Sequence, residues 1–288
     1  MTNLRQRMVE ELQRRNYSPS TIRGYIIAVK QFAEYFGKPP DRLGATHVQR
    51  FQWYLLQERK LASSTVEIRI AALRFFFKKM LKRRDMHFDD MPFPKVPQKL
   101  PTVLSPEEVQ RMIDGTTNLM HRTILMVLYA TGVRRTELSL LKVADIDSKR
   151  MVIRVEQGKG RKDRYVMLSP HLLGLLRAWW RAERPQGWLF PGRDRVLPMT
   201  TRQLNRACHA AAQRAEIDKR VSLHTLRHSF ATHLLEQNID VRVIQVLLGH
   251  AKLDTTALYT RVATRTISEV MSPLEHIALK LKEIRLPG

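Results

Sequence analysis

Basic and imidazole side chains gather in four short stretches of the sequence, all upstream of Tyr259. In one of them, His224 and Arg227 are three positions apart, so on a helix both side chains project from one face and can reach the same small anion. Arg134 follows a turn at Gly132, and its planar guanidinium suits two oxygens of one phosphate. The four stretches read TGVRRTEL at 131–138, QGKGRKDR at 157–164, HTLRH at 224–228 and LGH at 248–250.

Lys159 stands between Gly158 and Gly160 in a turn. The flexible backbone there would let its ammonium group enter a groove and donate a proton. Taken singly, each group has an ordinary interpretation: a solvated turn lysine, salt-bridged surface arginines, and His224 and His250 as polar groups with satisfied hydrogen bonds. The hypothesis of a single anion site therefore rests on the whole set.

Several other kinds of site are not indicated. The segment GKGRKDR lacks the Gly-x-x-x-x-Gly-Lys-Ser/Thr order of a nucleotide phosphate loop, which argues against an ATP-driven motor. No acidic set builds an obvious two-metal nuclease site, and no His/Cys cluster has the spacing of a zinc site. We therefore expect no metal and no cofactor. Cys208 is the one cysteine, so no internal disulfide forms, which fits a reducing cytoplasm.

The chain is strongly basic. Its 50 Lys and Arg against 27 Asp and Glu give a formal charge of +23, and the excess is spread over both the first hundred residues and the remainder. Such a charge favours a nucleic-acid partner held from two sides. A helical RNA-binding protein is an alternative that has only the charge in its favour. The N-terminus lacks a signal-peptide core and no segment is apolar enough to span a bilayer, so we expect no membrane contact and a cytoplasmic, nucleoid-associated protein.

Helical spacing of apolar residues predicts a small helical domain over residues 1–90, with helices at 3–15, 19–37, 46–59 and 62–84. The second of these buries Ile26, Val29, Phe32 and Phe36 along one face. Ser18 or Ser20 is the predicted cap of the second helix, and Ser63 or Ser64 that of the fourth. The run Phe75, Phe76 and Phe77 is interpreted as core packing.

Four prolines in MPFPKVPQKLP mark residues 91–103 as a linker, with a surface loop as the alternative. A second domain, 104–267, begins with Ser105 as N-cap and Pro106 at the first helical position. An apolar helix ends at Gly132, and residues 151–155 and 164–168 read as a β-hairpin. The fold class is thus mainly α with a small β-hairpin or sheet (α+β). The amphipathic tail, 268–288, is predicted to dock on a neighbouring protomer or to pack on its own chain.

The second domain resembles the catalytic domain of the tyrosine recombinases, also called the phage integrase family, over most of residues 105–265. ATGVRRTELSLL is similar to the family's first arginine box, GKGRKDR to its hairpin lysine, HTLRHSFATHLL to its histidine and arginine box, and VIQVLLGHAKLDTTALYTRV to its closing segment. More weakly, the first domain resembles the family's helical core-binding domain, which with the catalytic domain forms a C-shaped clamp around DNA.

The resemblance implies a site-specific recombinase of double-stranded DNA with Tyr259 as nucleophile. The phosphate-activating set would be Arg134, Lys159, His224, Arg227 and His250, with Glu137 helping to order the site. Arginines and histidines can stabilise charge on a phosphodiester without a metal, and a 3′-phosphotyrosine retains the bond energy, so religation needs no ATP. Lys159 is the expected proton donor to the departing 5′-oxygen.

The tail resembles the ends of integron-related and transposon-borne integrases. This resemblance favours a mobile-element or integron-related integrase of bacterial type, acting in DNA integration and excision as a tetramer on two sites. Arg261 stands where the family often has histidine, a change not expected to abolish activity. A type IB topoisomerase, which shares the tyrosine chemistry, is one alternative. A catalytically silent DNA-binding protein is another.

Overall fold

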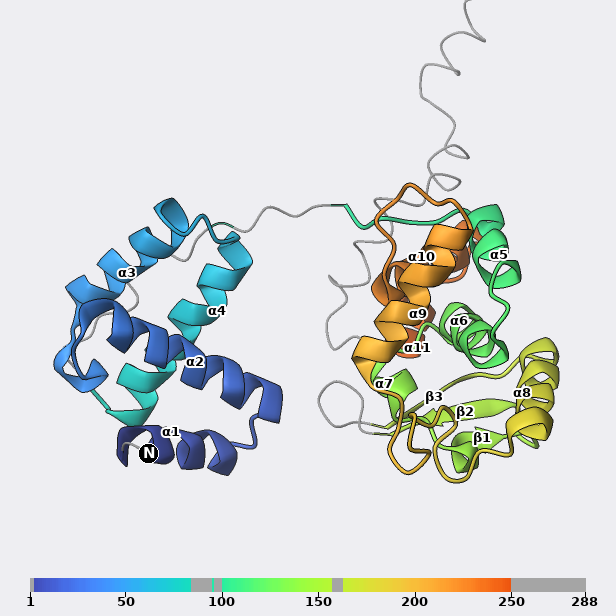
Figure 1. Ribbon diagram of the computed structural model, residues 1–288, viewed down its shortest axis with the longest axis horizontal. Coiled ribbons are helices and arrows are strands. Elements are labelled where there is room, and N and C mark those ends of the chain that lie inside the picture. The colour runs from blue at the N-terminus through green and yellow to red at the C-terminus, as the bar shows by residue number, and fades with distance from the viewer. Residues whose placement is uncertain (1–2, 84–94, 96–99, 157–162, 250–288) are drawn as a thin grey trace, which may run out of the picture. The chain divides into compact units, whose positions relative to one another are not determined.

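The computed structural model describes residues 3–83, 95, 100–156 and 163–249. The chain divides into two compact units, Met1–Gln98 and Lys99–Gly288 (Figure 1). Most of the described residues lie in helices, and the strands form one small sheet in the second unit. The predicted fold class, mainly α with a small sheet, is therefore confirmed. None of the helices in the described ranges combines the length and apolar character needed to cross a membrane.

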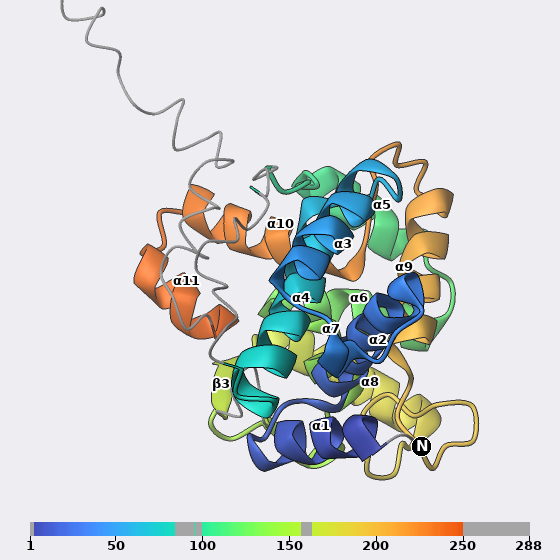
Figure 2. The ribbon, with the colours of Figure 1, turned by 90° about the vertical axis from the view of Figure 1, so that its left-hand side faces the viewer.

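The described residues of the first unit fold into helices and their connections, and Figure 2 labels α1 to α4. All four predicted helices are present, with ends that differ from prediction by a few residues. Ser18 caps the second, because its hydroxyl accepts the backbone N–H of Thr21. Their bounds are α1 Asn3–Arg14, α2 Pro19–Phe36, η1 Pro40–Arg42, α3 Ala45–Gln57, α4 Ser63–Arg74 and η2 Phe75–Met80.

One predicted cap is wrong. Helix α4 begins at Ser63 itself, so Ser63 and Ser64 lie inside its first turn, and the preceding Ala62 has no side chain that can cap. The predicted core run is confirmed: Phe75, Phe76 and Phe77 are all buried. They begin η2, a π-helical extension of α4. Helix α4 packs against α2 and α3, and η2 contacts α1. Neighbours on several sides explain how three consecutive rings are all covered.

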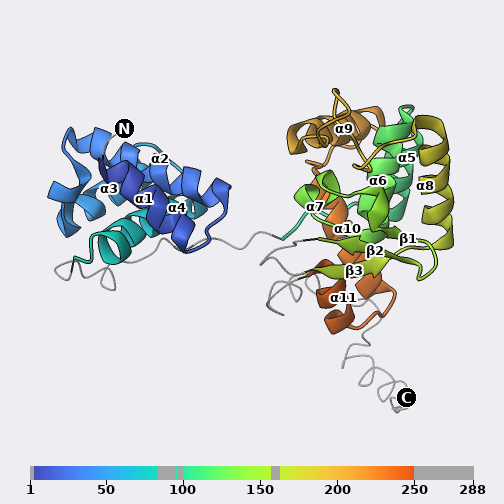
Figure 3. The same cartoon turned by 90° about the horizontal axis from the view of Figure 1, so that it is seen from below.

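The second unit surrounds helix α6, Leu119–Thr131, whose described contacts include α5, α8, α9 and α10 (Figure 3). Ser105 caps α5 as predicted, and it also forms a capping box with Glu108 that was not predicted. The further helices are α5 Pro106–Asp114, α7 Arg135–Ser139, η4 Val143–Asp145, α8 Pro170–Glu183, α9 Thr201–Arg214, α10 Leu223–Glu236 and α11 Val241–Leu248.

The sheet is antiparallel, with the strand order β1-β2-β3. Strands β2, Val152–Val155, and β3, Arg164–Met167, form the predicted hairpin, in which Val155 pairs with Arg164. A two-residue strand, β1, Ile146–Asp147, was not predicted, because so short a segment shows no alternation. Within β3, Arg164 and Val166 lie on the inner face, while Tyr165 and Met167 are exposed.

Helix α6 ends where the sequence predicts. Gly132 adopts a left-handed conformation with φ of 61°, and its backbone N–H bonds to the carbonyl of Leu128. A Cβ at this position would lie 2.3 Å from the ring of Phe230 on α10. Only glycine therefore fits the turn that leads from α6 to Arg134.

Candidate active site

Four of the seven predicted site residues fall within the described ranges: Arg134, Glu137, His224 and Arg227. The other three, Lys159, His250 and Tyr259, lie outside the described residues. Arg134 is the residue that precedes α7, Glu137 lies within α7, and the other two lie on α10. The site is therefore built from the turn after α6, the short α7, α10 and the end of α11.

Arg134 is held on two sides. Its Nη1 donates to Glu137 Oε1 at 2.7 Å, and its Nη2 donates to the carbonyl oxygen of Gly249 at 2.9 Å. Its backbone N–H also donates to Glu137 Oε2 at 2.7 Å. The side chain retains 19% exposure. The guanidinium is thus fixed while part of it still faces solvent, as an anion-binding group requires.

Arg227 is almost fully buried, with 1% exposure. Its Nη1 donates to the carbonyl of Gly132 at 2.6 Å, and its Nη2 donates to the carbonyl of Leu248 at 2.7 Å. These carbonyls terminate α6 and α11, where helical carbonyls lack intrahelical partners. Because Leu248 and Gly249 are consecutive, the end of α11 brings Arg227 and Arg134 together.

His224 lies one turn before Arg227 on α10, where part of the residue is exposed to solvent and part of its ring is covered by neighbouring groups. Partial burial of its ring, followed by the positive charges of Arg227 and Arg134, lowers its pKa. The imidazole is therefore neutral at neutral pH. The ring of His228 packs edge-on against it with centroids 4.4 Å apart, and burial lowers the pKa of His228 to about 4. His228 was not predicted, although its place four residues after His224 is a signal that it shares that face.

Arg164 is a further residue that the sequence reasoning missed. Its Nη1 and Nη2 donate to Glu137 Oε1 and Oε2 at 2.9 and 2.8 Å, and its Nε donates to the carbonyl of Leu247 at 3.0 Å. The side chain is 11% exposed. The available signal was its position: β-strand alternation places Arg164 on the same face as the apolar Val166.

Glu137 is the acidic centre of this cluster. Burial alone would raise its pKa, but hydrogen bonds from Arg164 and Arg134 outweigh burial and lower the pKa to about 2. The carboxylate is therefore ionised at all working pH values. Three arginines and one carboxylate leave a net positive site that suits a phosphate diester.

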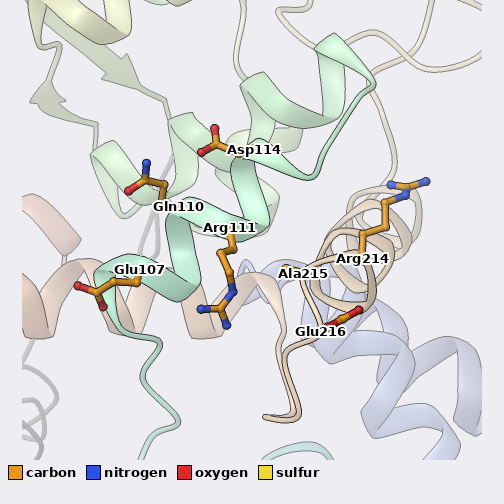
Figure 4. Close-up of a pocket in the computed structure, with 7 residues that line it drawn as sticks. All are labelled: Glu107, Gln110, Arg111, Asp114, Arg214, Ala215 and Glu216. Atoms are coloured by element: carbon orange, nitrogen blue, oxygen red, sulfur yellow. The ribbon is translucent and has the colours of Figure 1, made fainter.

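A hollow between α5 and the end of α9 contains none of the predicted residues. Figure 4 shows the acidic and basic side chains that line it on both sides. This mixture of charges gives no preference for an anion, so the arginine cluster is the stronger candidate site. The lining residues are Glu107, Gln110, Arg111, Asp114, Arg214, Ala215 and Glu216.

Comparison with known families agrees with this arrangement. Residues 102–265 match the phage integrase family, and residues 4–85 match the N-terminal SAM-like domain of phage integrases. The chain belongs to the phage integrase family, as its boxes predicted.

Individual relatives carry the assignment further. The protein y4qK of Sinorhizobium fredii, whose name describes an integrase/recombinase, is 51% identical over 96% of this chain and 89% of its own length. The tyrosine recombinase XerA of Thermococcus kodakarensis is 36% identical over 85% of this chain and 86% of its own. The chain is accordingly a site-specific DNA recombinase of the tyrosine class, and the topoisomerase alternative is not favoured.

Solved structures agree on the fold. The site-specific recombinase XerH, in a post-cleavage complex with its palindromic difH substrate, aligns with a TM-score of 0.72 at 24% identity. The alignment covers 91% of this chain and 82% of that one.

Proposed function

We propose that the recombinase cleaves DNA with Tyr259 as nucleophile and with Arg134, Arg227, His224, Lys159 and His250 as the groups that activate the phosphate. The observation that carries the proposal is the convergence of Arg134 and Arg227 on the carbonyls of Leu248 and Gly249. Two arginines from distant segments meet at the C-terminal end of α11, and His250 and Tyr259 follow that helix in the sequence. An arginine pair held in this way is already oriented when a phosphate enters.

The reaction exchanges one phosphoester for another. The phenolate oxygen of Tyr259 attacks phosphorus, a bond forms between them, and the bond from phosphorus to the 5′-oxygen breaks. Arg134 and Arg227 offset the charge that develops on the nonbridging oxygens. Lys159 donates its proton to the departing 5′-oxygen. A 5′-hydroxyl from another strand reverses these steps, which rejoins the DNA without ATP.

The proton of Tyr259 must leave at a pH well below the free phenol pKa of about 10. The lowered pKa of His224 supports a role here, since a neutral imidazole can accept a hydrogen bond or a proton. The arginine cluster also favours the phenolate through its charge. Both effects act without a metal ion.

A tetramer follows from stoichiometry. Reciprocal exchange between two duplexes breaks four strands, and each chain carries one Tyr259, so four copies supply the four nucleophiles. We assign residues 1–90 to a DNA-binding domain and 104–267 to the catalytic domain, and the basic charge of both regions supports a clamp around the duplex. Resemblance to integrases supports a role in integration and excision of a mobile element.

The test is covalent capture on a duplex that carries the recombination site and a nick beside the scissile phosphate, so that the freed strand diffuses away. The wild type should form a protein–DNA adduct in the presence of a chelator and without ATP. Tyr259→Phe should form none, while Tyr165→Phe, which changes an exposed tyrosine on β3, should match the wild type. Adduct formation by Tyr259→Phe would show that another residue attacks.

A second substrate with two sites separates recombination from relaxation. Strand exchange between the sites is the expected product. Relaxation of a supercoiled plasmid with no exchange would instead indicate a topoisomerase. Binding of the site with no adduct at all would indicate a silent DNA-binding protein.

A further inference from the structure

Arg164 joins three elements of the second unit. It begins β3, its guanidinium pairs with Glu137 on α7, and its Nε donates to Leu247 at the end of α11. At 11% exposure it has little contact with solvent. Its role is therefore internal, and its partners are the same elements that hold Arg134.

The carboxylate of Glu137 is shared between two arginines. Oε1 accepts from the Nη1 atoms of both Arg134 and Arg164, and Oε2 accepts from the backbone N–H of Arg134 and from Nη2 of Arg164. Four donors occupy the two oxygens, so the carboxylate has one orientation. Removing Arg164 would free half of these bonds and let Glu137, and Arg134 with it, take other positions.

The end of α11 is held in the same way. The carbonyls of Leu247, Leu248 and Gly249 accept in turn from Arg164, Arg227 and Arg134. Positive charge at a helix C-terminus is favourable because the last carbonyls lack intrahelical partners. A Cβ at Gly249 would lie 3.0 Å from Cδ of Arg164, so this side chain also packs closely on the turn that follows α11.

We propose that Arg164 is a positioning residue for DNA cleavage, which sets Arg134 through Glu137 and fixes the end of α11 from which the chain continues to Tyr259. The inference rests on the proposed function, because it gives Arg164 a part in DNA cleavage by Tyr259. Arg164 is assigned no contact with DNA.

The test compares Arg164→Gln, Arg164→Lys and the control Arg154→Gln in the full chain. Arg154 lies on the neighbouring strand, has ion pairs with Asp145 and Glu156, and is 42% exposed, so it matches Arg164 in chemistry but not in location. Single-turnover cleavage of the nicked duplex should fall by up to about 100-fold in Arg164→Gln, because Arg134 would no longer be held in place, while the Kd for DNA stays close to the wild-type value. Arg164→Lys should recover part of the rate, and Arg154→Gln should cleave as the wild type does.

A double variant identifies the route. If Arg164 acts through Glu137, Arg164→Gln combined with Glu137→Gln should be no slower than the slower single variant. Multiplication of the two effects would overturn this route. Cleavage by Arg164→Gln at the wild-type rate would overturn the proposal as a whole.

A substrate with sulfur in place of the bridging 5′-oxygen shows which step is slowed in Arg164→Gln. The slowed step is either charge stabilisation by Arg134 or protonation of the leaving group by Lys159. A thiolate leaves without being protonated, so this substrate should restore cleavage in Lys159→Ala. The defect of Arg164→Gln should persist on it. Full restoration of Arg164→Gln would show that the residue acts on the leaving group, against the route through Glu137. If the wild type cleaves neither the ordinary nicked duplex nor the duplex with bridging sulfur, the proposed function itself is contradicted.

Discussion

Glu137 shows how one buried residue organises several others. Its side chain is 4% exposed, and it carries a full charge only because Arg134 and Arg164 donate to both of its oxygens. A buried carboxylate without such partners would be costly and would take up a proton. The acid is therefore a structural requirement of the arginine pair, and its loss would leave two guanidinium groups facing each other.

The depressed pKa of Glu137 predicts a pH dependence of stability. The folded value is about 2 against an ordinary value of 4.5, so the stabilisation is complete above about pH 5 and is lost as the pH falls toward 2. The upper limit of this loss is about 3 kcal/mol. Urea unfolding of the wild type and of Glu137→Gln across pH 2.5–6 should show a flatter profile for the variant. Parallel profiles would mean that other carboxylates dominate acid unfolding.

At the scale of elements, helix ends decide where the arginines lie. The carbonyls that end α6 and α11 hold Arg227, and the left-handed turn at Gly132 delivers Arg134 to the start of α7. The turn at Gly132 was predicted, because a glycine after an apolar helical run is a local signal. The contacts that hold Arg134 and Arg227 were not predicted, since they join segments far apart in the chain.

Gly132→Ala should destabilise the protein by about 2–4 kcal/mol. The new Cβ would lie 2.3 Å from the Phe230 ring, and the alanine would have to adopt a φ of 61°, which is unfavourable for a residue with a side chain. Gly174→Ala is the matched control: Gly174 is an exposed residue of α8, and a Cβ added there would have no heavy atom within 4 Å. At this position the substitution should stabilise the helix by about 0.5–1 kcal/mol. Thermal unfolding of both variants gives the comparison, and equal Tm values would refute the steric account.

Local sequence patterns were enough to predict most of the helices and two of their caps. Apolar periodicity gave the helices of the first unit, and Ser18 and Ser105 cap α2 and α5 as expected. The cap of α4 was misplaced, because two adjacent serines offered a signal one residue too late. Arg164 was overlooked for a different reason: an arginine in a basic segment gives no sign that its partner is Glu137, which only tertiary packing brings within reach.

For the whole molecule, the charge of +23 carries a prediction about salt. If Lys and Arg of both units contact phosphates, binding releases counterions and log Kd depends linearly on the logarithm of salt concentration. Affinity for a duplex site should fall about 10³-fold or more between 50 and 200 mM salt, as expected for several phosphate contacts. Fluorescence anisotropy across this range measures the slope. A slope that corresponds to only one or two phosphates would mean that most of the charge lies away from DNA.

The central claim is that Tyr259 becomes covalently attached to DNA, and identification of the modified residue tests it most directly. The adduct captured on the nicked duplex would be digested with a nuclease and a protease, and the peptide that carries the residual nucleotide would be sequenced by mass spectrometry. The expected result is a nucleotide linked through its 3′-phosphate to Tyr259. A nucleotide on any other residue, or a linkage through a 5′-phosphate, would contradict the account.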